Sequence, residues 1–184
     1  MSNREKSQTS SEFKVNGILV DKGVRVSNRP HVDELSSRGY GAKDGKDLLL
    51  TFYEGLYLLE KLMLNVKDEK GRNVDFQNLV QCYESVNENA WAGYLVYRDL
   101  RSRGYVVREG FGSKVDFRVY ERGDYSKNTA KYLIITVQEG KPISIEDLTK
   151  TLTESLSLKK ELVIAVINRR GETVYYSVSE LTLN

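Results

Sequence analysis

Cysteine and histidine are scarce in this sequence of 184 residues, which contains one of each, Cys82 and His31. A single cysteine cannot form an internal disulfide, and one cysteine with one histidine cannot supply the ligands of a structural zinc site. No cysteine or carboxylate partner for His31 is evident, so we expect it to have a structural or surface role. We expect Cys82 to be a small residue of the core.

Long apolar runs are also absent. The longest, LLL and LVIAVI, are far shorter than the roughly 20 residues that span a bilayer. The first twelve residues, MSNREKSQTSSE, contain no apolar segment, so we expect residues 1–12 to form a flexible tail and not a signal peptide. A composition of 40% hydrophobic and 29% charged residues is too apolar for general disorder. We therefore expect a globular, cytoplasmic protein with no membrane partner.

Several sequence patterns of catalysis and nucleotide binding are missing. There is no G-x-S-x-G, no P-loop and no G-x-G-x-x-G, so nothing indicates a nucleophile elbow or a nucleotide-binding fold. Acidic residues do not cluster in the spacing of a divalent-metal nuclease. We therefore expect neither a bound metal nor a cofactor.

The net charge of +2 is too small to indicate a nucleic-acid partner by itself. Basic residues are nevertheless dense between positions 94 and 118 and recur near the end of the chain. They are Arg98, Arg101, Arg103, Arg108, Lys114 and Arg118, followed later by Lys159, Lys160, Arg169 and Arg170. On charge alone, a solvated surface is the simpler interpretation, and RNA binding is the alternative.

The first half of the sequence predicts a mixed α/β arrangement. Alternation in FKVNGILVDKGVRVSN predicts a hairpin with its turn at residues 21–23, followed by a loop rich in Gly and Ser. Apolar residues recur every three or four positions in DLLLTFYEGLYLLEKLML, which predicts a helix with an apolar stripe from Leu49 to Met63. A short strand at LNVKD precedes a second helix, which Asp75 caps and which extends to Val86.

The second half predicts the order helix, three strands, helix, two strands. The first helix, WAGYLVYRDLRSRG, ends at Gly104, and strands follow at YVVRE, VDFRVY and KYLIITV. Ser144 and Asp147 form a variant of the capping box at the start of the next helix, before the strands ELVIAVI and ETVYYSV. The fold class is therefore α/β, with a mixed domain at residues 13–87 and an α/β domain at residues 88–184.

Tyr120 at a strand end and Lys160 before a buried strand mean nothing as an isolated pair. However, the segment YLVYRDLRSRGYVVREGFGSKVDFRVY, residues 94–120, resembles the start of the catalytic domain of archaeal tRNA splicing endonucleases. The similarity continues through KYLIITV and LKKELVIAV, and more loosely through the first half. It implies a small mixed N-terminal domain followed by an α/β nuclease domain.

The resemblance also implies a chemistry. Members of this family cut pre-tRNA at bulge-helix-bulge junctions without metal and leave a 2′,3′-cyclic phosphate and a 5′-hydroxyl. The reaction needs a base for the 2′-hydroxyl, an acid for the leaving oxygen and a cation for the phosphorane, and tyrosine, histidine and lysine are assigned these places. Tyr120 matches the tyrosine and Lys160 the lysine, so both are candidate catalytic residues.

The histidine of the family does not occur in this sequence. It should precede the KYLI strand, where this sequence reads TAKYL and places Thr129. A threonine hydroxyl cannot act as a general acid near neutral pH, so this step should be slower by about 10²- to 10⁴-fold. Tyr125 in the same loop is the alternative acid, although a phenol with a reference pKa of about 10 is a poorer donor than an imidazolium.

Two arginines that clamp a flipped base in active relatives are also missing. Thr153 stands seven residues before the lysine, and the last strand, TVYYSV, has no arginine. The sequence therefore resembles the structural subunit of the heterotetrameric enzymes, with a histidine-bearing catalytic subunit and, through the assembly, pre-tRNA as partners.

The final strand could add to a partner's sheet edge, and the isolated chain could form a homodimer. The turn NRRGE before this strand lacks the acidic pattern that is frequent in the family.

Two other hypotheses stay open from the sequence. The chain could be an active endonuclease that uses Tyr120, Lys160 and an unorthodox acid such as Tyr125. It could also be a stand-alone RNA-binding or scaffold protein on the same fold, in which Lys159, Arg169 and Arg170 are candidate RNA contacts.

Overall fold

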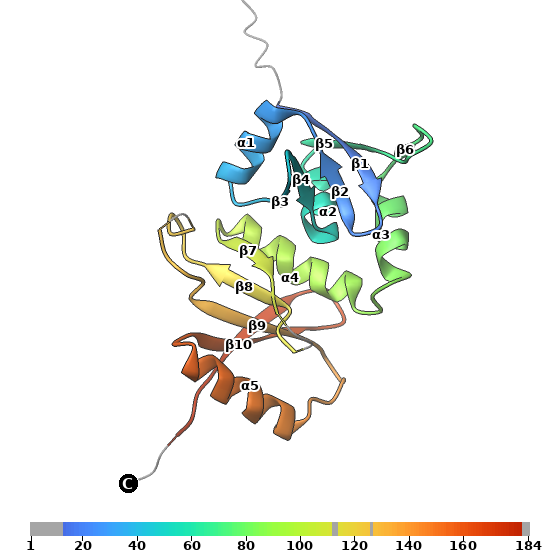
Figure 1. Ribbon diagram of the computed structural model, residues 1–184. Coiled ribbons are helices and arrows are strands. Elements are labelled where there is room, and N and C mark those ends of the chain that lie inside the picture. Colours follow the sequence, from blue (N-terminus) through green and yellow to red (C-terminus); the bar gives the residue numbers. More distant parts are fainter. Residues whose placement is uncertain (1–12, 112–113, 126, 182–184) are drawn as a thin grey trace, which may run out of the picture.

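The computed structural model describes residues 13–111, 114–125 and 127–181, so the predicted tail at residues 1–12 lies outside the described range. Within that range the chain forms two mixed sheets and five helices, which confirms the predicted α/β class (Figure 1). Among these residues, none of the helices combines the length and the apolar character that crossing a membrane requires.

The first sheet has six strands in the order β3-β4-β2-β1-β5-β6. They are β1 (Val15–Val20), β2 (Gly23–Val26), β3 (Ala42–Asp44), β4 (Asp47–Leu50), β5 (Leu64–Lys67) and β6 (Asn73–Val74). The predicted hairpin is confirmed, because β1 and β2 pair antiparallel with Val20 opposite Gly23. Gly23 has a φ of 141°, and a Cβ there would lie 2.0 Å from the carbonyl oxygen of Leu50, so only glycine fits this approach of β4.

The predicted helix over DLLLTFYEGLYLLEKLML is wrong in its first part. Residues 47–50 form the strand β4, in which Leu48 and Leu50 alternate into the core, and α2 covers only Phe52–Glu60. The helix begins there because the Thr51 hydroxyl accepts from the amide of Glu54 while the Glu54 carboxylate accepts from the amide of Thr51. Threonine followed by glutamate three residues later was the signal for this boundary.

Three further expectations for the first half need correction. The predicted loop after β2 contains the helix α1 (Arg29–Ser37), so His31 lies on a helix, where its ring meets Phe13 edge to face. Asp75 caps α3 (Phe76–Glu84) as predicted, but Val86 lies beyond the end of this helix and is exposed. Cys82 is exposed on α3 and is not a core residue, because it falls outside the buried face that Leu79, Val80 and Tyr83 form.

The second sheet confirms the predicted order of elements, with strands arranged β11-β10-β9-β8-β7. The elements are α4 (Ala90–Ser102), β7 (Val106–Glu109), β8 (Phe117–Tyr120), β9 (Tyr132–Gln138), α5 (Ile145–Ser157), β10 (Glu161–Ile167) and β11 (Thr173–Val178). Gly104 follows α4 with a left-handed φ of 89°, as predicted. At α5 the Ser144 hydroxyl accepts from the Asp147 amide, but the Asp147 carboxylate pairs with Lys114 and does not complete a capping box.

Helix α4 lies between the two sheets and joins them into one core. It contacts α2 and α3 on one side and strands β7, β9 and β10 on the other, while α5 covers the opposite face of the second sheet (Figure 1). The main hydrophobic cluster therefore includes Leu56 and Leu79 from the first half together with Phe117 and Ile134 from the second. The sequence division at residues 87 and 88 stays a prediction.

A buried ion pair links the halves. Glu54 on α2 is fully buried, and its carboxylate accepts from the amides of Gly41 (3.0 Å) and Thr51 (2.8 Å) and from Nη1 of Arg108 on β7 (2.9 Å). Burial raises the pKa of Glu54, and the Arg108 charge and the two amides oppose that rise. The carboxylate is thus the shared acceptor for groups from three separate segments.

Replacement of Glu54 should be far more destabilising than loss of a surface pair. We expect Glu54→Ala to lower the free energy of unfolding by about 3–5 kcal/mol, because it leaves Arg108 with little access to water and no carboxylate. Urea denaturation at pH 7 measures this, with Glu34→Ala as the control. Glu34 pairs with Arg38 at the surface, so its loss should cost less than about 1 kcal/mol. Equal effects of the two substitutions would contradict the linking role of Glu54.

Candidate active site

The topology of the second sheet brings three distant segments to one edge. Strand β8 runs antiparallel to β9, and β9 runs parallel to β10 with Tyr132 opposite Glu161. The end of β8 and the beginnings of β9 and β10 therefore lie at the same edge. This places Tyr120, Thr129 and Lys160 side by side, although the first and the last are forty residues apart in sequence.

The end of α5 fixes the position of Lys160. Lys159 adopts a left-handed φ of 55°, its amide donates to the Leu156 carbonyl, and the Lys160 amide donates to the Ser155 carbonyl. These two bonds form the Schellman motif, in which glycine normally occupies the position of Lys159. The chain thus turns sharply from the helix into β10 with Lys160 at a defined place.

The Lys160 ammonium is held at the sheet edge by a backbone acceptor. Its Nζ lies 2.5 Å from the carbonyl oxygen of Ala130, the residue after Thr129. Lys131 belongs to a separate network, because its ammonium lies 2.7 Å from the Glu121 carboxylate, and that hydrogen bond raises the pKa of Lys131. Lys160 is therefore the lysine that faces the position where the family's histidine is expected.

These residues line a cleft of about 550 Å³. Its lining includes Phe111, Arg118, Tyr120, Tyr125, Thr129 and Lys160. Among the described residues of the lining there is neither a histidine nor a carboxylate. The site thus offers two cations, two phenols and an aromatic ring, and its cations can neutralise a phosphate, but its described lining offers no imidazole.

The two tyrosines of the cleft support each other. The rings of Tyr120 and Tyr125 meet edge to face at 5.0 Å between centroids. Tyr125 also approaches Gly39, which follows α1 with a φ of 76°, and a Cβ on Gly39 would lie 3.3 Å from Tyr125 Cδ1 and 2.6 Å from Val106. The first half of the chain therefore contacts the loop that carries Tyr125.

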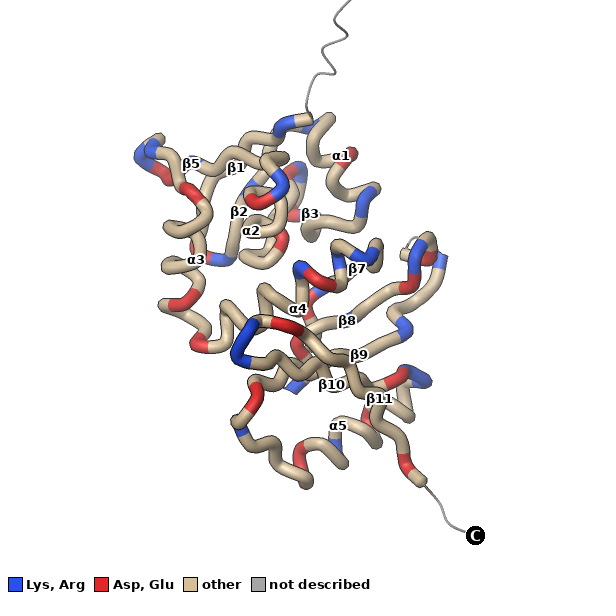
Figure 2. The backbone as a smooth tube through the Cα atoms, turned by 180° about the vertical axis from the view of Figure 1, so that it is seen from behind, with Lys and Arg blue, Asp and Glu red and all other residues tan. Residues whose placement is uncertain are grey.

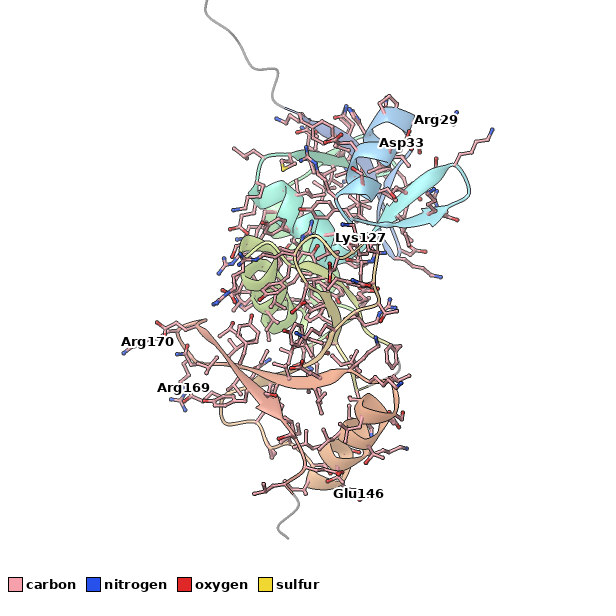
Figure 3. The ribbon with its side chains drawn as sticks, turned by 90° about the vertical axis from the view of Figure 1, so that its left-hand side faces the viewer. Arg29, Asp33, Lys127, Glu146, Arg169 and Arg170 are labelled. Atoms are coloured by element: carbon pink, nitrogen blue, oxygen red, sulfur yellow. The ribbon has the colours of Figure 1, made fainter. Side chains whose placement is uncertain are left out.

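The structure separates the residues expected to bind RNA. Lys159 is exposed beside the cleft, whereas Arg169 and Arg170 occupy the turn at the far end of β10 and project from the side of the molecule (Figure 3). A strand of seven residues spans about 23 Å, so one nucleotide cannot contact both groups. Lys and Arg are distributed over both halves, with Asp and Glu among them (Figure 2).

Five of the six basic residues between positions 94 and 118 have a carboxylate or an aromatic partner within the chain. Arg108 pairs with Glu54 and Arg103 with Asp99, while the Arg101 guanidinium lies 3.9 Å from the centre of the Tyr40 ring. Arg98 and Lys114 also face carboxylates. Arg108 is largely enclosed, but Arg98 and Arg103 remain 41% and 53% exposed, so the interpretation of this group as solvated surface charge stays a prediction. Arg118 lies in the cleft.

Sequence reasoning did not single out Phe111 and Arg118 as cleft residues. Arg118 was visible only as one of six basic residues, and Phe111 only as part of the turn GFGSK. The remaining sequence candidates lie elsewhere. Thr153 is exposed on α5, where its hydroxyl donates to the Thr149 carbonyl, and His31 is not part of the cleft lining.

Two family models match this chain. The model described as tRNA intron endonuclease, N-terminal domain, matches residues 15–80. The model described as tRNA intron endonuclease, catalytic C-terminal domain, matches residues 90–176, which include the whole cleft. With both domains matched in this order, and with the relatives below, the chain belongs to the tRNA intron endonuclease family.

Proteins named tRNA-splicing endonuclease are similar over nearly the whole chain. That of Methanococcus maripaludis is 32% identical over 165 residues, which are 90% of this chain and 93% of the relative. That of Pyrococcus furiosus is 33% identical over 172 residues, or 93% and 96% of the two chains. That of Methanococcoides burtonii is 31% identical over 163 residues, which are 88% of this chain but 43% of the relative.

The left-handed conformation of Lys159 gives a direct test of the geometry that positions Lys160. We expect Lys159→Gly to raise the free energy of unfolding by about 0.5–1 kcal/mol, because glycine adopts this conformation without steric cost. Lys150→Gly, at an exposed interior position of α5, is the control and should lower it by about 1 kcal/mol. Thermal and urea unfolding measure both, and a loss of stability in Lys159→Gly would argue against the Schellman motif.

Proposed function

We propose that this chain is the structural, non-cutting subunit of an archaeal tRNA splicing endonuclease. In this proposal it supports a histidine-bearing catalytic subunit that cleaves cytoplasmic pre-tRNA at bulge-helix-bulge introns without metal, leaving a 2′,3′-cyclic phosphate and a 5′-hydroxyl. The observation that carries the proposal is the cleft, where Tyr120, Thr129 and Lys160 line one surface and no imidazole is among the described lining residues.

The chemistry of the cleft supports an inactive subunit. Cleavage by the 2′-hydroxyl needs a base, an acid for the leaving 5′ oxygen and a cation near the phosphorane. The Tyr120 phenol and the Lys160 ammonium fit the first and the third requirement. The Thr129 hydroxyl does not release its proton in the working pH range, so the leaving group has no acid beside it.

A second candidate function has one observation in its favour. The Tyr125 phenol lies in the same cleft as Tyr120, with their rings 5.0 Å apart, so it is the group best placed to replace the missing acid. In that case the chain would cleave RNA alone. A stand-alone RNA-binding or scaffold protein, the third hypothesis, would neither cleave nor assemble with another subunit.

The edge strand of the second sheet, β11, is the surface on which we expect a partner subunit to bind. Strand β11 pairs only with β10 among the described strands, and its side chains alternate, so that Tyr175 packs inward and donates to Asp99. Val174 and Tyr176 point outward and are 49% and 55% exposed. An edge strand with apolar outward side chains is suited to pairing with a second subunit, or with a second copy of this chain when it is isolated. Arg169 and Arg170 stay candidate RNA contacts in the assembled complex.

Cleavage by separate and mixed subunits tests the proposal. We expect no cleavage of a bulge-helix-bulge RNA in EDTA by this chain alone, and cleavage after it is mixed with a histidine-bearing subunit from the same cell. The control is a mixture in which the partner's histidine has been replaced, which should be inactive. Cleavage by the isolated chain that is lost in Tyr125→Phe would instead support the second candidate function.

The proposed partner surface makes a separate prediction. Tyr176→Lys should weaken assembly at least tenfold, because it places a charge in an apolar strand interface. Ile18→Lys is the matched control, since Ile18 is also on a strand, is 49% exposed and lies on the other sheet. Sedimentation velocity of the chain alone and of the mixture measures assembly. Assembly that is equally strong in both variants would exclude β11 as the interface.

A further inference from the structure

The cleft keeps features that catalysis by this chain does not explain. Resting on the proposed function, we propose that it is a non-cutting RNA-binding site, in which Arg118 and Lys160 bind a backbone phosphate and Phe111 stacks on the adjoining base. The subunit would then hold precursor RNA directly, in addition to supporting its catalytic partner.

Arg118 differs from the basic residues around it. Each of the other five between positions 94 and 118 meets a carboxylate or an aromatic ring within the protein. Arg118 donates from Nε to the carbonyl oxygen of Glu109 at 2.9 Å, and no carboxylate partner for it exists among the described residues. This contact orients the guanidinium and leaves its two terminal nitrogens for a ligand. A planar guanidinium with its outer edge available suits bidentate binding of a phosphate.

Lys160 adds a second cation to the same cleft. One of its three donors is used by the Ala130 carbonyl, so two remain. Because no carboxylate is among the described lining residues, the two positive charges are not neutralised locally. A phosphodiester is therefore favoured over a neutral ligand, and an acidic peptide would not use the exposed ring of Phe111 in the same cleft.

Phe111 provides the aromatic surface of the cleft. Its side chain is 43% exposed and lines the cleft, and no ring stacks on it among the described residues. The preceding residue is tightly constrained, because the Gly110 amide donates to the Asp116 carbonyl at 2.7 Å and a Cβ on Gly110 would lie 1.8 Å from the Val115 carbonyl oxygen. The backbone next to Phe111 is thus fixed. An exposed aromatic ring on a fixed backbone, next to cations, is the usual platform on which an unpaired nucleobase stacks.

The test measures binding of an uncleavable RNA to the full chain. The probe is a bulge-helix-bulge RNA with 2′-deoxy sugars at the two cleavage sites and 2-aminopurine in one bulge. We expect Phe111→Leu to weaken binding about 5- to 100-fold and to reduce the quenching of 2-aminopurine, whereas Phe111→Tyr should bind nearly as the parent does. Arg118→Gln should weaken binding and lower the slope of log K against log salt by about one.

The controls separate this proposal from the previous one. Arg122→Gln, at an exposed arginine outside the cleft lining, should change affinity less than twofold. All variants should keep the parent's thermal stability and its assembly with the histidine-bearing subunit, because Phe111 and Arg118 lie at the surface of the cleft. Unchanged RNA affinity in Phe111→Leu and Arg118→Gln, with assembly intact, would overturn the RNA site and leave the structural-subunit proposal standing. Loss of partner binding with RNA binding retained would show that the cleft binds protein, which also overturns it.

Discussion

The parallel pairing of β9 with β10 is the constraint on which the rest of the site depends. Two parallel strands begin at the same edge, and the helix α5 must return the chain along the sheet before β10 can start. The residues before each strand, Thr129 and Lys160, therefore become neighbours whatever their side chains are. The antiparallel strand β8 ends at that edge and adds Tyr120. The backbone alone thus builds the arrangement of three residues.

The first half of the chain supports this site by packing against it, and none of the described residues that line the cleft comes from the first half. Its helix α2 packs on α4, and the Glu54 carboxylate joins the segment around Gly41 to Arg108 on β7. The same segment presents Gly39 to the Tyr125 ring, which in turn meets Tyr120. Loss of the Glu54–Arg108 ion pair would therefore alter the part of the cleft that Tyr125 lines. The two halves also share one hydrophobic core, because α4 packs on elements of both.

In the function that we propose, a cleft without the histidine but with its two cations separates RNA binding from RNA cleavage. Proton transfer to a leaving oxygen needs a group whose pKa lies near the working pH, and a hydroxyl at position 129 cannot meet that requirement. Attraction of a phosphate needs only positive charge that is not neutralised by neighbours, and Arg118 and Lys160 meet it. The two properties depend on different side chains, so one can be lost while the other persists.

Local patterns in the sequence determined most elements of this protein, including the first hairpin, the cap at Asp75 and the chain reversal after α4. They also determined that a threonine stands before the KYLI strand. Tertiary structure decided what depends on distant neighbours: that residues 47–50 pair as a strand, that Cys82 faces water, and that Arg118, alone of six basic residues, remains available in the cleft. Capping and periodicity act over a few residues and can be read from the sequence. The partner of a charge is set by packing between segments far apart in the chain, which no short stretch of sequence specifies.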